Sequence, residues 1–164
     1  MPTNMAALFK TLTQGVYVIG VADQNQANAF TAAWVMQTSF QPMMLALSIN
    51  PNHSSWALLQ SGAGFSVNVL SDQQLDLAAH FAKPASTNKL AAINWHPSNL
   101  GYPIIDSASA WFECQYLDHL TSGDHIIVSA KVCDGQLIDS NALPLNYRQT
   151  LDLDQSASLY PDSF

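Results

Sequence analysis

The segment from Asn28 to Pro42 has residue types that could hold a flat, phosphate-bearing ligand. Its sequence, NAFTAAWVMQTSFQP, places a Thr-Ala-Ala run and a Thr-Ser pair in one strand-like stretch bounded by an Asn and a Pro. Small side chains let a ligand approach the backbone, while hydroxyls and free amides offer hydrogen bonds. Two further segments fit a site of this kind, the GFSVNVL stretch at 64–70 and the turn Gly123-Asp124-His125.

The composition indicates one domain over 1–164, since the chain has 164 residues and 48% hydrophobic content. It contains no apolar run of the roughly 20 residues that a membrane span requires, and its N-terminus lacks a secretory pattern. We therefore expect a cytoplasmic protein without a membrane partner. The net charge of −7 disfavours nucleic acid as a partner. Five basic residues are candidates for contact with a phosphate: Lys10, Lys83, Lys89, Lys131 and Arg148.

Neither the cysteines nor the histidines show metal-ligand spacing. Cys114 and Cys133 lie in strand-like segments without a CxxC pattern, so we expect two buried, reduced thiols. No metal is assigned, because the histidines outside the Gly-Asp-His turn are scattered: His53, His80, His96 and His119.

Hydrophobic periodicity predicts strands over 15–22, 27–38, 43–49, 64–70, 108–117 and 125–133, with a short last strand at 145–147. Short helices are expected over 5–12, 54–61 and about 72–82, the last opened by a capping box of Ser71 and Gln74. In the 64–70 strand we expect Ser66 and Asn68 on a solvent-facing side. Residues 83–103 are expected to form an irregular loop, and 149–164 an acidic arm or loose tail.

The hairpin spacing of these strands predicts a mainly β fold, a small antiparallel barrel with a few short helices. A βαβ pattern with a Gly-rich turn is missing. The segment SGAGFS at 61–66 does not supply GxGxxG, which argues against a Rossmann-type dinucleotide site.

The order of motifs resembles the flavin reductase-like family, the FMN-binding split β-barrels, and is especially similar to the flavin reductase modules associated with flavodiiron proteins. The resemblance covers about residues 8–148 and rests on these segments: Gly15-Val16-Tyr17-Val18, Asn28 to Trp34, Ser39-Phe40-Gln41-Pro42, Phe65 to Leu70, His80-Phe81-Ala82, Glu113-Cys114, Gly123-Asp124-His125 and Tyr147-Arg148.

The resemblance implies a homodimer with flavin sites near the subunit interface. It also implies hydride transfer from NADH or NADPH to N5 of a flavin, with FMN as the cofactor and FAD as an alternative. Reduced flavin would then serve a flavin-dependent oxygenase, a diiron protein or ferric iron.

Residue by residue, the resemblance places Thr31, Ala32, Ala33 and Trp34 along the isoalloxazine ring and His125 on its nicotinamide side. Lys89 is the candidate counter-charge for the phosphate. The resemblance assigns the other cofactor contacts, those toward the ribityl-phosphate arm among them, to six polar residues: Asn28, Thr38, Ser39, Asn50, Ser54 and Ser55.

The sequence also allows structural roles for these residues and other functions for the chain. The Thr-Ala-Ala run fits an ordinary strand, Ser54 a helix cap, Lys89 a solvated surface charge and His125 a structural side chain. For the whole chain, one alternative is a flavin-binding electron carrier or sensor without nicotinamide turnover, because Gln41-Pro42-Met43 replaces the family's acidic-Pro-Pro. Another is a dimeric barrel for haem or a deazaflavin.

Overall fold

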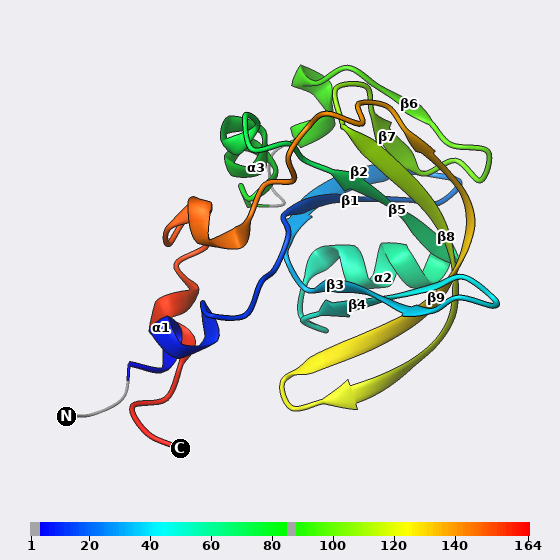
Figure 1. The fold of residues 1–164 in the computed structure, drawn as a ribbon. Helices are drawn as coiled ribbons and strands as arrows, with labels where there is room; N and C mark the ends of the chain where they lie inside the picture. The colour runs from blue at the N-terminus through cyan, green and yellow to red at the C-terminus, as the bar shows by residue number, and fades with distance from the viewer. Residues whose placement is uncertain (1–3, 85–87) are drawn as a thin grey trace.

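The computed structural model describes residues 4–84 and 88–164. In this part of the chain seven strands form one antiparallel sheet in the order β2-β1-β5-β8-β9-β4-β3 (Figure 1). The predicted mainly β, antiparallel fold is confirmed. The strands are β1 Tyr17–Ala22, β2 Ala27–Ala32, β3 Val35–Ser39, β4 Met44–Ile49, β5 Gly64–Val69, β8 Ala110–Ser122 and β9 His125–Leu137.

The sheet curls into a barrel because its two edge strands are consecutive in the chain. Strand β2 lies at one edge and β3 at the other, yet only Ala33 and Trp34 separate them. The three steps from Ala32 to Val35 span at most about 10 Å, so the two edges must approach one another. The prediction of a single strand over 27–38 is therefore wrong. This segment forms two strands: β2 pairs with β1 as far as Ala32, and β3 pairs with β4 from Val35 onward.

The helices α1 Met5–Phe9, α2 Ser54–Ser61 and α3 Leu75–Phe81 fall in the three predicted places. The bounds of α2 match the prediction, and Gly62 follows its last residue, but its N-cap is His53. At α3 the expected capping box is half formed, since the Ser71 amide donates to Gln74 Oε1 at 2.9 Å while the helix begins at Leu75.

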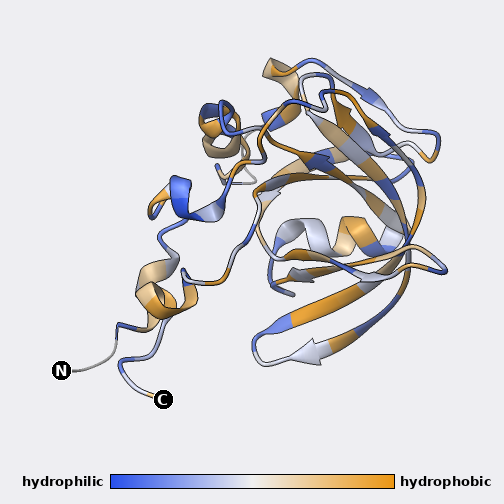
Figure 2. Ribbon diagram, viewed as in Figure 1, coloured by the Kyte–Doolittle hydropathy of each residue, from blue (hydrophilic) through white to orange (hydrophobic). Residues whose placement is uncertain are grey.

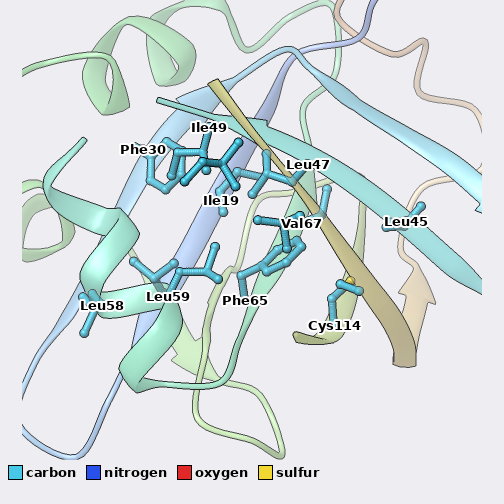
Figure 3. Packing of buried hydrophobic residues seen from close by; sticks show 14 residues of the cluster. Ile19, Phe30, Leu45, Leu47, Ile49, Leu58, Leu59, Phe65, Val67 and Cys114 are labelled. Atoms are coloured by element: carbon cyan, nitrogen blue, oxygen red, sulfur yellow. The ribbon is translucent and has the colours of Figure 1, made fainter. Parts of the chain in front are cut away.

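The main core lies between the inner face of the curled sheet and α2 (Figure 3). Phe65, Leu47 and Leu59 are fully buried there. Figure 2 shows apolar residues along the strands that surround α2, and again at α1. Each fully buried side chain of this kind contributes about 1.5–3 kcal/mol relative to its exposed state. This packing fixes α2 relative to β1, β2 and β5.

Strand β5 is buried on both faces, which corrects the expected solvent-facing side. Ser66 and Asn68 are fully buried under the small sheet of β6 Trp95–Pro97 and β7 Pro103–Ile105. The Asn68 amide nitrogen donates to Val18 O at 3.0 Å, and its oxygen accepts from the Ile105 amide at 2.8 Å. The alternation of residue types in β5 correctly separated its two faces. It did not predict that the small β6–β7 sheet covers the polar face.

The region expected as an irregular loop contains β6, β7 and a 3-10 turn at Lys89–Ala92, and its residues 85–87 lie outside the described part. The short strand expected at 145–147 is reduced to the bridge Gly15↔Asn146, and a 3-10 turn follows over Tyr147–Thr150.

Two expectations for the long hairpin β8–β9 are also corrected. Cys114 is buried as predicted, but Cys133 is exposed. Alternation over 108–117 predicts that Ala110, Phe112, Cys114 and Tyr116 point inward. Phe112 is exposed instead, because register shifts at Glu113/Cys114 and Tyr116/Asp118 interrupt the alternation of β8.

Among the described residues, no helix is both long and apolar enough to cross a membrane.

Candidate functional site

A groove of about 560 Å³ opens where the edge of the barrel meets the two chain termini. Its size falls in the usual range for sites that bind small molecules and cofactors. The β3–β4 hairpin and the start of β9 form one side, and the segments around α1 and the C-terminus form the other. The residues that line it are Phe9, Leu12, Thr13, Gln14, Gly15, Tyr17, Ala33, Trp34, Val35, Met36, Ala46, Ser48, Ser122, Asp124, His125, Ile127 and Tyr160.

Trp34 and His125, which the resemblance assigns to the ring and to its nicotinamide side, meet in this groove. Their ring centroids lie 4.8 Å apart with planes at 56°. The Nδ1–H of His125 donates to the Asp124 carboxylate at 2.7 Å, which lowers the pKa of Asp124 and fixes the orientation of the imidazole. The position of Asp124 in a tight turn predicts that its carboxylate bonds backbone amides. In the structure the carboxylate instead positions His125.

Small residues next to this pair leave space for a flat ring. Ala33 lies at the crossing between the sheet edges, and Ala46 and Ser48 face the groove from β4. A Cβ at Gly15 would lie 2.4 Å from the Tyr17 hydroxyl oxygen, so a side chain there would require the Tyr17 ring to move. Backbone is thus accessible along the groove wall.

Gln14 gives the groove a hydrogen-bond acceptor. Within the described residues, its side-chain oxygen Oε1 is buried and has no hydrogen-bond partner. A buried acceptor of this kind costs about 1–3 kcal/mol when unpaired. Both the N3–H of a flavin and the carboxamide of nicotinamide carry the donor that Gln14 lacks. The groove therefore suits either ring.

A second, polar cluster lies at the start of β2 and the N-terminus of α2. The Asn28 amide donates to Ser55 Oγ at 3.2 Å, and His53 Nδ1 accepts from the Ser55 amide at 3.2 Å. The His53 ring packs on Phe30 with centroids 4.4 Å apart. Burial, and secondarily the charge of Lys89, lower the pKa of His53. A helix N-terminus with hydroxyl, amide and ammonium groups nearby suits a phosphate.

Lys89 is buried, with 3% of its surface exposed, so it is not the solvated surface charge that was the alternative. Its ammonium donates to the carbonyls of Phe81 at 3.1 Å and Lys83 at 3.2 Å, at the C-terminus of α3. Burial lowers its pKa. A buried ammonium needs anionic or carbonyl partners, and the described contacts account for two of its three donors.

Thr31 and Ala32 lie at the end of β2 and are not among the residues that line the groove. The Thr31 hydroxyl donates to Ala78 O at 2.6 Å and so ties β2 to α3. With Ala33, both residues line a small cavity of about 60 Å³ next to Tyr147. Asn28 and Ala32 are about 13 Å apart along β2, so one strand connects the polar cluster to the edge of the groove.

Thr38 and Ser39 are not brought together with the other predicted phosphate contacts within one protomer. Ser39 pairs with Met44 at the far end of the β3–β4 hairpin, about 20 Å along β4 from Asn50. Asn50 instead accepts from the Asn52 amide at 2.9 Å, and Ser54 is exposed in the first turn of α2. Of the predicted set, Asn28 and Ser55 are hydrogen-bonded to each other, and Lys89 lies near enough to lower the pKa of the neighbouring His53. Ala33, Trp34 and His125 line the groove.

Sequence patterns did not point to Gln14, Ser48, Phe9 or Tyr160 as groove residues. Gln14 directly precedes the Gly-Val-Tyr-Val motif, which was the available signal for it. Phe9 and Tyr160 lie near opposite ends of the chain, and no local pattern links them.

Comparison with known proteins identifies the family. The sequence model of the flavin reductase like domain matches residues 9–151. This chain belongs to the flavin reductase-like family. It is 32% identical over 125 residues to the reductase component of the flavin-dependent trigonelline monooxygenase of Acinetobacter baylyi, covering 76% of this chain and 40% of that protein. It is 27% identical over 135 residues to diflavin flavoprotein A 1 of Synechocystis, covering 80% of this chain and 24% of the relative.

The chain thus spans less than half the length of these two relatives. Among solved structures it is similar to nitrilotriacetate monooxygenase component B from Mycobacterium thermoresistibile, with 26% identity and a TM-score of 0.81 over 87% of this chain and 80% of that one. This likeness agrees with the predicted split barrel.

Proposed function

We propose that this chain is an NAD(P)H-dependent flavin reductase that binds FMN, with FAD as an alternative. The observation that carries the proposal is the groove in which the Trp34–His125 pair faces small residues and the unpaired Gln14 oxygen. Family membership supports the same function. The polar cluster of Asn28, Ser55 and Lys89 supplies a place for the flavin phosphate at the other end of β2.

When bound, the flavin supplies the ring that accepts hydride from the nicotinamide. The chain's own residues then need only bind, orient and exclude water, since no protein nucleophile is required. Ala33 lets the ring lie against the backbone, and Gln14 accepts from an N–H at its edge. His125, held by Asp124, contacts the nicotinamide side and orients the co-substrate.

A homodimer is part of the proposal. The outward side of β3 carries Met36, 64% exposed, and the adjoining turn carries Phe40 and Met43, 85% and 60% exposed. A second copy covering this face would enclose the groove next to it. Light scattering should give the mass of two chains, and Phe40→Asp should shift it to that of one chain.

The proposal also includes a downstream protein that accepts electrons from the reduced flavin. The trigonelline relative is the reductase component of a monooxygenase, and the diflavin relative carries a comparable segment within a longer chain. By this comparison the present chain delivers reduced flavin to an oxygenase or diiron protein.

The test is an absorbance spectrum of the purified protein with FMN, followed by NADH or NADPH without oxygen. Rapid loss of flavin absorbance is expected with at least one nicotinamide. Flavin binding without loss of flavin absorbance on addition of either nicotinamide would contradict reductase activity. It would favour the alternative of a flavin-binding electron carrier or sensor, which the segment Gln41-Pro42-Met43 suggested. Failure to bind FMN or FAD would contradict both.

A further inference from the structure

The two chain termini meet at the groove. Phe9 at the end of α1 stacks on Tyr160, with ring centroids 5.4 Å apart and planes at 27°. In Figure 1 the N-terminal helix, in blue, and the C-terminal segment, in red, lie side by side beyond the barrel. Both rings line the same groove as Trp34 and His125.

Several contacts hold the C-terminal arm, residues 149–164, in this position. The Lys10 ammonium donates to Leu151 O at 2.6 Å at the start of the arm. The Tyr147 hydroxyl donates to the Asp154 carboxylate at 2.9 Å and lies 2.8 Å from Ser156 Oγ. The segment is therefore an anchored arm, as one of the two expectations had it, and not a loose tail.

Most of the arm also lies outside the residues that the family model matches. The family match ends at residue 151, so Tyr160 lies outside the matched residues. A residue of this kind can set which ligand the groove prefers without being part of the common machinery.

The groove thus contains two aromatic pairs, Trp34–His125 from the barrel and Phe9–Tyr160 from the termini. No Lys or Arg is among the described residues that line it. Such a groove suits a ligand with two flat ring systems better than one recognised through its phosphates. Phe9 is 47% exposed, so its ring is accessible.

We propose that the Phe9–Tyr160 pair binds the adenine ring of a dinucleotide whose reactive ring lies at Trp34 and His125. The proposal rests on the proposed flavin reductase function and extends it to the specificity of the groove. Adenine is present in NAD(P)H and in FAD but not in FMN or reduced nicotinamide mononucleotide. Stacking of a base on an aromatic side chain corresponds to about fivefold or more in affinity.

The first experiment needs no turnover. Protein saturated with FMN is titrated with ADP-ribose by calorimetry, and apo protein is titrated with FAD and with FMN. If NAD(P)H supplies the adenine, Tyr160→Ala should weaken ADP-ribose binding about fivefold or more. If FAD supplies it, the same variant should weaken FAD binding while FMN binding stays unchanged. Tyr160→Phe, which retains the ring, should restore binding in either case.

Leu159→Ala is the matched control, because Leu159 is 81% exposed on the same arm and does not line the groove. In kinetics, Tyr160→Ala should raise KM for NADH but not for reduced nicotinamide mononucleotide if NADH is the source. Unchanged binding of both ADP-ribose and FAD in Tyr160→Ala would overturn the inference, as would equal losses for FAD and FMN. Absence of flavin reduction in the wild type, with ADP-ribose binding intact and sensitive to Tyr160, would overturn the proposed function alone.

Discussion

The indole of Trp34 packs on the imidazole of His125, although the two residues are about 90 positions apart in the chain and belong to different parts of the sheet. Trp34 lies at the crossing from β2 to β3, and His125 begins β9, two strands away from β3 in the sheet. The Trp34 carbonyl accepts from the Ser48 amide at 2.9 Å, which fixes the backbone of the crossing. The pair is thus built on backbone that the β3–β4 hairpin holds in place.

His125→Ala should lower kcat/KM for NADH by about 10- to 100-fold, because the imidazole that orients the nicotinamide is removed. Anaerobic stopped-flow reduction of bound flavin measures this step. Asp124→Asn, which retains a hydrogen-bond acceptor for Nδ1–H, should have a smaller effect. Equal rates for wild type and His125→Ala would show that the residue is structural.

Lys89→Met should weaken FMN binding by about 10- to 100-fold, the loss typical of a hydrogen bond to a charged group. Riboflavin, which lacks the phosphate, should bind the variant and the wild type equally. Fluorescence titration with both flavins makes the comparison, and Lys131→Met serves as the exposed control. If FMN and riboflavin weaken together, Lys89 acts on the fold of α3 rather than on the phosphate.

Stability should fall at acid pH through His53. Burial lowers the pKa of His53 from its ordinary 6.5, so the unfolded chain takes up a proton before the folded one does. The stabilisation is therefore complete above about pH 6.5 and is lost as the pH falls through the lower folded pKa. Protonation at Nδ1 also removes the acceptor for the Ser55 amide.

His53→Asn keeps an N-cap acceptor that does not titrate. Urea unfolding at pH 7.5, 6 and 5 should show a shallower loss of stability for this variant than for the wild type, with a difference of about 1 kcal/mol at pH 5. Parallel losses in the two proteins would assign the acid sensitivity to other groups.

Asn68→Leu should destabilise the fold by about 2–4 kcal/mol, because the Ile105 amide and the Val18 carbonyl are left buried without their partner. Ser66→Ala should cost less, about 1 kcal/mol. The reason is that the Pro103 carbonyl, to which Ser66 donates, also accepts from Asn68 at 3.2 Å. Denaturant midpoints of the two variants test the order, which would be contradicted if Ser66→Ala cost as much.

The sequence alone determined the elements whose cause is local. The alternation of Ile126, Val128 and Ala130 predicted β9 and its buried face, and the apolar spacing with Gly62 at the end predicted α2. The ordered motifs indicated the family and the antiparallel barrel. They also pointed to Ala33, Trp34 and His125, because small residues and a Gly-Asp-His turn are short-range signals.

Only the tertiary structure decided which of these residues meet. Thr38 and Asn50 are near in sequence, yet a straight hairpin carries them to opposite ends of β4. Phe9 and Tyr160 are almost a chain length apart, yet they stack because Lys10 and Tyr147 hold the arm against α1. Periodicity records which face of one strand is buried. It gives no information about the packing between segments that are distant in sequence, and that packing forms the groove.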